Sequence, residues 1–284
     1  MNPTSGRTSN DAAVLAIHAA AIERNVDFKF RYTTGQNDNE AIEHDLMWYK
    51  PDCVVACGGD GTIQVVAKNL IGKTVPLGIL PLGSANGLAK SLEIPTNVEE
   101  AIALIMDTPT TRPLDLLRVD NEHLCVHLGD IGTNALLVKN YTEAGDKGMI
   151  GYAKHLLAAI QQSELMHYTI TTPKGVCEKE GYMLAFANAH KYGTGVHISQ
   201  GSVSDGKFEI CNVQQIDLES AIKAGLTALN VFVDKDMFSD VISCTHAHIK
   251  IDKPTDLQID GEYIGETDEL TIEIIPSAIN VLVP

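Results

Sequence analysis

The chain has 284 residues, enough for two domains with separate hydrophobic cores. Its formal net charge of −16 argues against a nucleic-acid partner, which would require a basic face, and no apolar run reaches the ~18 residues of a membrane span. The polar N-terminus shows no signal peptide, and six scattered cysteines without a CxxC spacing are typical of reduced thiols, so we expect a cytoplasmic protein.

Helical and strand patterns alternate through the first part of the chain. The apolar spacing predicts helices over residues 11–24, 40–50, 62–71, 84–92 and 97–106. Alternating or continuous apolar runs predict strands over 26–32, 53–57 and 76–80. This βα alternation predicts a doubly wound, parallel sheet.

Short strands dominate after Pro113. They are predicted over 114–119, 123–128, 168–172, 182–187, 208–213, 246–251, 257–259, 270–275 and 279–283, with helical stretches over 148–163 and 217–233. Many short strands with turn signals between them indicate a β-sandwich. We therefore place a domain boundary near Arg112, with an α/β domain over 1–112 and a β-sandwich domain over 113–284.

A glycine-rich turn follows the predicted strand at 53–57. Gly58, Gly59 and Gly61 allow backbone N–H groups to approach a ligand, and the helix that follows directs its positive end to the same place, which suits phosphate. Asp60 would repel bare phosphate, so we expect it to act through Mg²⁺ or a proton. The alternative is an ordinary strand–turn–helix connection, because glycine-rich turns are common.

Two further small-residue loops precede predicted helices. In one, Ser84 is either the N-cap of a helix or a phosphate contact, and Asn86 offers an amide at the same edge. The other is the opening Asn-Pro-Thr-Ser-Gly at 2–6. Adjacent strand-to-helix turns at the carboxyl edge of a parallel sheet form a crevice for a nucleotide, so three such loops favour nucleotide binding.

These segments resemble the diacylglycerol kinase catalytic domain, which is shared with sphingosine kinases and bacterial lipid kinases. The resemblance lies in residues 2–6, Gly-Gly-Asp-Gly-Thr at 58–62 and Pro-Leu-Gly-Ser-Ala-Asn at 81–86, and continues through 188–195, 204–208, Asp-Gly-Glu at 260–262 and the closing residues 275–284. It covers essentially the whole chain. It implies a nucleotide-binding domain followed by a lipid-substrate domain.

The resemblance also implies the reaction. A member of this family would transfer the γ-phosphate of ATP to a hydroxyl of a membrane lipid, such as diacylglycerol or a sphingoid base, with Mg²⁺ as cofactor. Such a cytoplasmic enzyme would touch the membrane transiently and peripherally. The sequence leaves open whether it forms a homodimer.

The same resemblance assigns roles to residues. ATP contacts would come from Asn2, Pro3, Thr4, Ser5, Gly6, Thr33, Thr34, Gly58, Gly59, Asp60, Gly61, Thr62, Ser84 and Asn86. Asp60 would organise the catalytic Mg²⁺, and Glu262 would be the general base, with Asp60 as the competing base. Asp205 would bind a structural Mg²⁺ in the second domain. Turn or cap roles remain the alternatives for the threonines, for Asp205 and for the Asp-Gly turn before Glu262.

Two departures from the family pattern motivate other hypotheses. Only Met1 precedes Asn2, where the family has an apolar strand near the middle of the sheet, and Gly87 stands where many bacterial lipid kinases have Asp. A non-catalytic nucleotide- or lipid-binding module is therefore one alternative. A soluble small-molecule kinase related to NAD kinases, which also carry Gly-Gly-Asp-Gly-Thr, is another.

Overall fold

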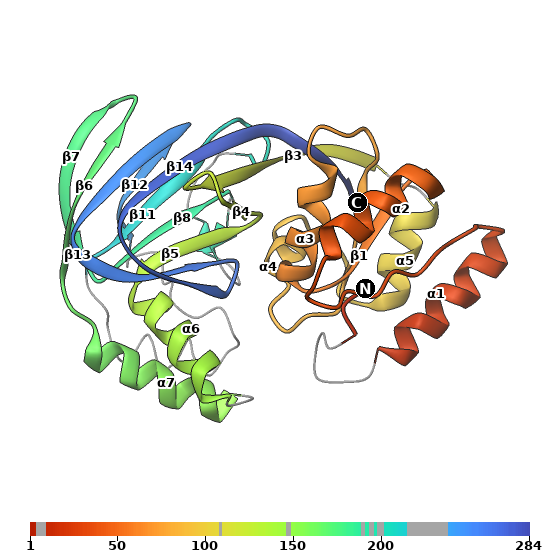
Figure 1. Cartoon of the computed structure of the whole chain (residues 1–284), viewed down its shortest axis with the longest axis horizontal. Helices are drawn as coiled ribbons and strands as arrows, with labels where there is room; N and C mark the ends of the chain where they lie inside the picture. Colours follow the sequence, from red (N-terminus) through yellow and green to blue (C-terminus); the bar gives the residue numbers. More distant parts are fainter. Residues whose placement is uncertain are drawn as a thin grey trace. The chain divides into compact units, whose positions relative to one another are not determined.

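The chain forms two compact units in the computed structural model, which describes residues 1–3, 10–107, 110–145, 149–188, 191–192, 196–197, 202–214 and 238–284 (Figure 1). The first unit combines Met1–Leu114 with Ser277–Pro284, and the second is Asp115–Pro276. The chain enters the second unit within strand β3 (Thr110–Val119) and leaves it within strand β14 (Glu262–Val283). The residues from Ser277 onwards, which we placed in the second domain, thus cluster with the first unit.

The first unit is built on parallel strands. Its elements are α1 (Asp11–Arg24), α2 (Asp38–Tyr49), β1 (Val54–Gly58), α3 (Asp60–Leu70), β2 (Leu77–Pro81), α4 (Gly87–Ser91) and α5 (Val98–Asp107). Strand β1 pairs in parallel with β2, and Val281 at the end of β14 pairs in parallel with Leu77. This last pairing returns the end of the chain to the first unit.

Both faces of the β1–β2 pair are covered by helices, as the doubly wound pattern predicts. Cys57 and Leu80 pack with apolar residues of α1 and α5 on one face. Ala56 and Ile79, which alternate with them, are also buried, and α3 contacts both strands. Burial raises the pKa of the Cys57 thiol to about 11, which is consistent with a packing role.

The strand predicted over 26–32 is wrong, because the structure gives these residues no strand conformation. Met1 and Asn2 lie between this segment and β1. The N-terminal ammonium donates to the Arg31 carbonyl at 2.7 Å, and Thr33 N–H donates to the Met1 carbonyl at 2.9 Å. Asn2 N–H then donates to the Cys57 carbonyl at 3.0 Å. These hydrogen bonds involve two residues, Met1 and Asn2, which are too few to form a continuous β-ladder with their neighbours.

The second unit consists mainly of antiparallel strands. Its remaining elements are β4 (His123–Cys125), β5 (Leu128–Gly132), α6 (Thr133–Ala144), α7 (Met149–Gln162), β6 (Met166–Thr172), β7 (Gly175–Gly181), β8 (Met183–Ala187), β9 (Lys191–Tyr192), β10 (Val196–His197), β11 (Phe208–Val213), β12 (Phe238–Cys244) and β13 (His246–Ile259). The strand order is β14-β13-β5-β8-β11-β12, with β6 also on β13, β7 on β6, and β3 and β4 beyond β14.

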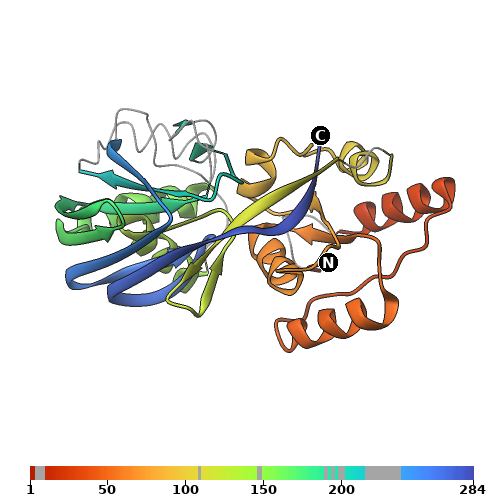
Figure 2. The ribbon, with the colours of Figure 1, turned by 90° about the horizontal axis from the view of Figure 1, so that it is seen from above.

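An apolar core holds these strands together in the predicted β-sandwich arrangement. It includes Leu117, Phe186, Phe208, Ile249 and Ile272, which come from strands on several branches of the sheet. Strand β13 pairs with β6 through its first half and with β5 through its last residues. The long hairpin of β13 and β14 is blue in Figure 2 and lies beside the green strands β6 and β7.

Several local predictions in this unit need correction. The strand predicted over 123–128 is divided into β4 and β5, because the Asp260 carboxylate accepts the backbone N–H groups of residues 126–128. The sequence patterns also missed α6, β7 and β12. The predicted helix 148–163 is confirmed as α7. The predicted helix 217–233 lies outside the described residues.

Candidate functional site

The two glycine-bearing loops of the first unit touch each other through their backbones. Gly59 is the N-cap of α3, and an added Cβ on Gly83 would lie 2.4 Å from the Gly59 Cα and 3.0 Å from its nitrogen. Only a residue without a side chain fits at position 83. The loops at residues 58–62 and 81–88 therefore form one continuous structure.

Asp60 joins these loops through its carboxylate. Its two oxygens accept the backbone N–H groups of Gly87 at 2.9 Å and of Leu88 at 3.0 Å, the first residues of α4. The expectation that Ser84 caps this helix is wrong: Ser84 is exposed, and Asn86 occupies the N-cap in a left-handed conformation, φ 52°. Asp60 supplies from the other loop the acceptor that a cap side chain would otherwise provide.

Asn86 stabilises the loop in which it lies. Its Oδ1 accepts the Gly83 N–H at 2.9 Å, and its Nδ2 donates to the Gly83 carbonyl at 2.9 Å. The side chain is 8% exposed. These bonds fix the loop that faces Gly59, and the predicted contact of Asn86 with ATP stays a prediction.

The predicted threonine contacts differ from each other in their surroundings. Thr33 is half-buried and bonded to Met1, whereas the Thr34 hydroxyl is held in a local turn with Gln36. Asp38 accepts the Thr34 N–H at 2.9 Å, and backbone hydrogen bonds of this kind lower the pKa of the Asp38 carboxyl. Thr34 thus takes part in a local turn, which is the role given above as the alternative to an ATP contact. The predicted contacts Thr4, Ser5 and Gly6 lie outside the described residues.

The Asp-Gly-Glu segment forms a tight hairpin turn between β13 and β14. Asp260 and Gly261 have φ values of 51° and 87°, as a type I′ turn requires, and Ile259 pairs with Glu262. The Asp260 carboxylate accepts the N–H groups of Val126 at 2.8 Å and His127 at 2.9 Å. The turn is therefore anchored to the β4–β5 connection, while Glu262 is exposed on it.

Asp205 lies in a compact turn of the second unit. Its carboxylate oxygens accept the backbone N–H groups of Ser202 and Lys207, each at 3.0 Å. The buried Asp115 accepts the neighbouring Gly206 N–H at 2.7 Å. In the part of the chain that the structure describes, no group of three or more His, Cys, Asp or Glu side chains could hold a metal. A structural Mg²⁺ at Asp205 stays a prediction.

Sequence patterns missed how much of the site depends on contacts between segments. The structure brings Gly59, Asp60, Gly83 and Asn86 together in the first unit. The sequence contains the signal for Gly83, a glycine in a loop before a helix, but does not identify its neighbour. The remaining predicted residues of this unit, Gly58, Gly61 and Thr62, lie at the β1–α3 junction, where Thr62 is buried.

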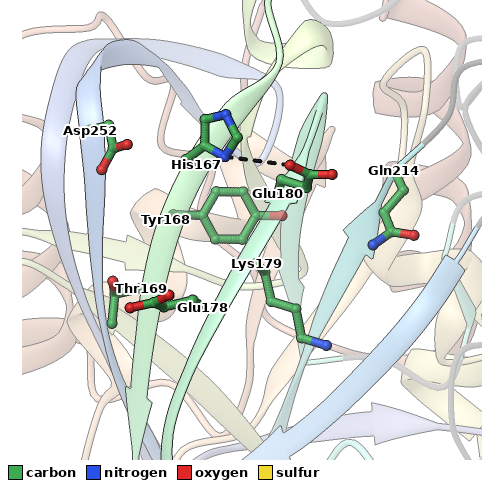
Figure 3. A pocket seen from close by; sticks show the side chains of 8 residues that line it. All are labelled: His167, Tyr168, Thr169, Glu178, Lys179, Glu180, Gln214 and Asp252. Carbon is green, nitrogen blue, oxygen red and sulfur yellow. Dashed lines mark ion pairs between the residues drawn. The ribbon is translucent and has the colours of Figure 1, made fainter.

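Two pockets of the second unit contain none of the predicted site residues. One has a volume of about 660 Å³ on the β6–β7 hairpin, and Figure 3 shows its mostly polar lining, with His167 and Glu180 paired at 3.5 Å. The other, of about 330 Å³, lies beside Thr133, Met166 and Asp256. The charged lining of the first pocket is unfavourable for an acyl chain.

Comparison with known proteins adds to this geometry. Residues 1–119 match the model of the diacylglycerol kinase catalytic domain, and residues 131–283 match that of the YegS C-terminal NAD kinase beta sandwich-like domain. The second match covers more than half of the chain, so the chain belongs to the YegS C-terminal NAD kinase beta sandwich-like domain family, and its first part is a diacylglycerol kinase catalytic domain. The resemblance drawn from residues 2–6, 58–62, 81–86 and 260–262 is thus confirmed.

Individual relatives in this family agree with that placement. A probable lipid kinase YegS-like from Stenotrophomonas maltophilia is 26% identical over 280 residues, covering 91% of this chain and 87% of that protein. A putative diacylglycerol kinase from Bacillus anthracis has the same fold, with a TM-score of 0.76 at 20% identity, over 100% of this chain and 94% of that one. An NAD kinase from Archaeoglobus fulgidus, solved with ATP, gives 0.53 at 12% identity, over 99% and 90%.

Within the described ranges, no helix combines the length and the apolar character that crossing a bilayer requires.

Proposed function

We propose that this protein is a lipid kinase that transfers the γ-phosphate of ATP to a hydroxyl of a membrane lipid, such as diacylglycerol or a sphingoid base. The observation that carries the proposal is the Asp60 carboxylate at the junction of the two glycine loops. Phosphoryl transfer needs a rigid cradle for the nucleotide and a group that holds the cation beside its phosphates. The fused loops would form the cradle, and Asp60 would hold the cation.

The donor set of the first unit fits a magnesium ion bound together with a nucleotide. Each Asp60 oxygen accepts one N–H group, and a carboxylate has about four lone-pair sites, so acceptor capacity remains. Mg²⁺ is usually held by one or two carboxylates together with phosphate oxygens and water. When bound, the ion would offset the negative charge of the phosphates. Asp60 would hold it, and the loop backbone would orient the nucleotide.

Glu262 is proposed as the group that takes the proton of the lipid hydroxyl. It is exposed on a turn whose backbone is fixed by Asp260, so its carboxylate can meet a substrate without displacing a structural partner of the turn. A carboxylate is a sufficient base when the proton leaves as the new P–O bond forms. Because the acceptor lipid resides in a bilayer, the enzyme would make transient peripheral contact with the membrane.

The proposal is tested by incubating the protein with labelled ATP, Mg²⁺ and mixed micelles that contain diacylglycerol, sphingosine or ceramide. NAD serves as the soluble acceptor of the rival hypothesis, which the likeness to an NAD kinase fold motivates. We expect label in a lipid and none in NADP. Label in NADP alone would identify a soluble small-molecule kinase, and no transfer to any acceptor would favour a binding module.

The Glu262→Gln variant tests the assigned base. Glutamine keeps the size and hydrogen bonding of the side chain but cannot accept the proton. We expect kcat to fall about a hundredfold or more, with little change in the KM for ATP. Normal turnover of this variant, combined with a dead Asp60→Asn that still binds ATP and Mg²⁺, would transfer the role of base to Asp60.

A further inference from the structure

A buried polar pair lies directly beneath the turn that carries Glu262. Gln258 of β13 stands opposite Asp130 of β5 in the antiparallel register, and the two residues are 1% and 0% exposed. Gln258 Nε2 donates to Asp130 Oδ2 at 2.5 Å. Its other amide atom, Oε1, accepts the backbone N–H of Gly261 at 2.8 Å. One side chain thus connects a buried carboxylate to the residue before Glu262.

The chemistry of Asp130 determines which way the Gln258 amide points. Asp130 Oδ2 accepts from the NH₂ end of the amide, which leaves the amide oxygen directed at the Gly261 N–H. Asn134, in the first turn of α6, donates to the same Asp130 oxygen at 2.7 Å and further restrains the carboxylate. If the amide were reversed, its oxygen would face the Asp130 carboxylate and its NH₂ group would face the Gly261 N–H. Both hydrogen bonds would then be lost.

The turn needs this restraint because β14 is irregular immediately after it. Leu257 pairs with Gly265, but Gln258 pairs with Tyr263, so Ile264 is an extra residue in β14. A bulge of this kind bends a strand and redirects its side chains. The Asp260 carboxylate anchors one side of the turn to residues 126–128, and Gln258 anchors Gly261 from within.

We propose that Asp130 and Gln258 are positioning residues, which hold the 260–262 turn in the conformation that presents Glu262 to the acceptor hydroxyl. Neither residue touches substrate. The inference rests on the proposed function of Glu262 and extends it to a pair of residues that the motif at 260–262 does not include. Because a base misplaced by about 1 Å can lose about a hundredfold in rate, a hydrogen bond at this point has a kinetic effect beyond its effect on stability.

The test compares two variants that each remove a buried amide from the second unit. Gln258→Met keeps the volume of the side chain and loses both hydrogen bonds. Asn212→Leu is the matched control: Asn212 is 2% exposed, accepts from the Tyr168 hydroxyl and donates to the Glu180 carbonyl at 3.0 Å, away from the turn. Both variants should lower the melting temperature by a comparable amount.

The decisive readouts are kcat, the KM for ATP and amide hydrogen exchange of residues 259–263. We expect Gln258→Met to lower kcat about tenfold or more, with the KM for ATP nearly unchanged, and to speed exchange at Gly261; Asn212→Leu should do neither. Unchanged protection of Gly261, or a fall in kcat no larger than in the control, would overturn the proposal.

A second variant covers the case in which Gln258→Met does not fold. Asp130→Asn preserves shape but offers Gln258 either an oxygen or an NH₂ group, so the amide is no longer forced to point at Gly261. The same readouts then decide, with a smaller expected loss of kcat, an unchanged KM for ATP and faster exchange at Gly261. If the wild-type protein phosphorylates no lipid, the proposed function fails, whereas the exchange measurement still shows whether the pair orders the turn.

Discussion

At the scale of single residues, the carboxylates of the two predicted acidic motifs are both engaged with backbone N–H groups. Asp60 binds the first N–H groups of α4, and Asp260 binds those of the β4–β5 connection. The sequence identified each as part of a chemical motif. The structure adds that each also holds distant segments together, so a substitution at either position affects packing as well as chemistry.

Replacement of Asp60 by Asn separates these contributions. The amide offers one acceptor instead of two, so we expect one α4 N–H to lose its partner and stability to fall by about 1–2 kcal/mol. If Asp60 also holds Mg²⁺, turnover should fall at least a hundredfold, and more Mg²⁺ should be needed for half-maximal rate. The measurements are thermal unfolding and a Mg²⁺ titration of activity.

Asn97→Ala is the control for this prediction. Asn97 Oδ1 accepts the Glu100 N–H at 3.0 Å as the cap of α5, so its loss should cost about 1 kcal/mol without affecting turnover. Equal losses of activity in the two variants would restrict Asp60 to a structural role.

At the scale of elements, the first unit depends on close approaches that the secondary structure alone does not reveal. The two loops meet at Gly59 and Gly83, and the segment before α2 is attached to that helix by charge. Each contact joins segments that are separated in the sequence. Each can be broken by one substitution that leaves the helices and strands themselves unchanged.

Gly83→Ala should separate the two glycine loops. Its Cβ would lie 2.4 Å from the Gly59 Cα. Both loops meet there through backbone atoms, which cannot move aside as the end of a flexible side chain can. We expect a loss of about 3 kcal/mol and weaker binding of ATP, measured by urea unfolding and calorimetry. Gly72→Ala is the control, since its φ is 72° but its Cβ would meet nothing within 4 Å, so it should cost only about 1 kcal/mol. A Gly83 variant no less stable than this control would refute the steric argument.

Asp45 provides a pH-dependent link between α2 and the preceding segment. It pairs with Arg31 at 2.7 Å and Lys29 at 2.6 Å, and the hydrogen bond from Arg31 holds the pKa of the Asp45 carboxyl well below its ordinary value. Because the pKa is depressed in the folded state, the stabilisation is present above the unfolded value of about 3.9 and is lost as the pH falls toward the folded value.

We therefore expect Asp45→Asn to lower the free energy of unfolding by about 1 kcal/mol at pH 7, and by progressively less below about pH 4. Urea unfolding at neutral and acidic pH measures the difference. Glu164→Gln, which removes an exposed pair with Lys253 at 3.7 Å, should change stability at neither pH. A difference for Asp45→Asn that does not shrink in acid would contradict the ion-pair explanation.

At the scale of the whole molecule, the two units are not consecutive lengths of chain. The last residues of β14 return to the first unit, where Ala278, Ile279, Val281, Leu282 and Val283 are buried. Gly72 N–H also donates to the Ala278 carbonyl at 3.0 Å. The first unit is therefore completed only after the second has been synthesised.

Deletion of residues 277–284 should unfold the first unit. Burial of a large aliphatic side chain contributes about 1.5–3 kcal/mol, so the segment contributes on the order of the 5–15 kcal/mol that stabilise a whole domain. Limited proteolysis should then degrade residues 1–114 and spare the second unit. Removal of the exposed Pro284 alone should leave the digestion pattern unchanged. A truncated protein with an intact first unit would show that the returning strand is dispensable.

Local chemistry in the sequence determined much of this protein. Helical spacing located α1 and α5, alternation of strands and helices indicated the parallel sheet, and the Asp-Gly pair at 260–261 predicted the hairpin turn that carries Glu262. Short glycine motifs placed the chain in its family. These features are set by the conformational preferences of residues that are neighbours in the chain, so a sequence displays them directly.

The tertiary structure alone decided which distant groups satisfy one another. It showed that Asp60 takes the place of a cap at α4, that Asp260 divides a predicted strand into β4 and β5, and that residues 26–32 contact Met1 instead of forming a strand. It also showed that Val281, near the end of the chain, pairs in parallel with Leu77 of β2. Buried N–H groups, carbonyls and carboxylates must find partners, but partners far apart in the chain leave no periodic pattern in the sequence.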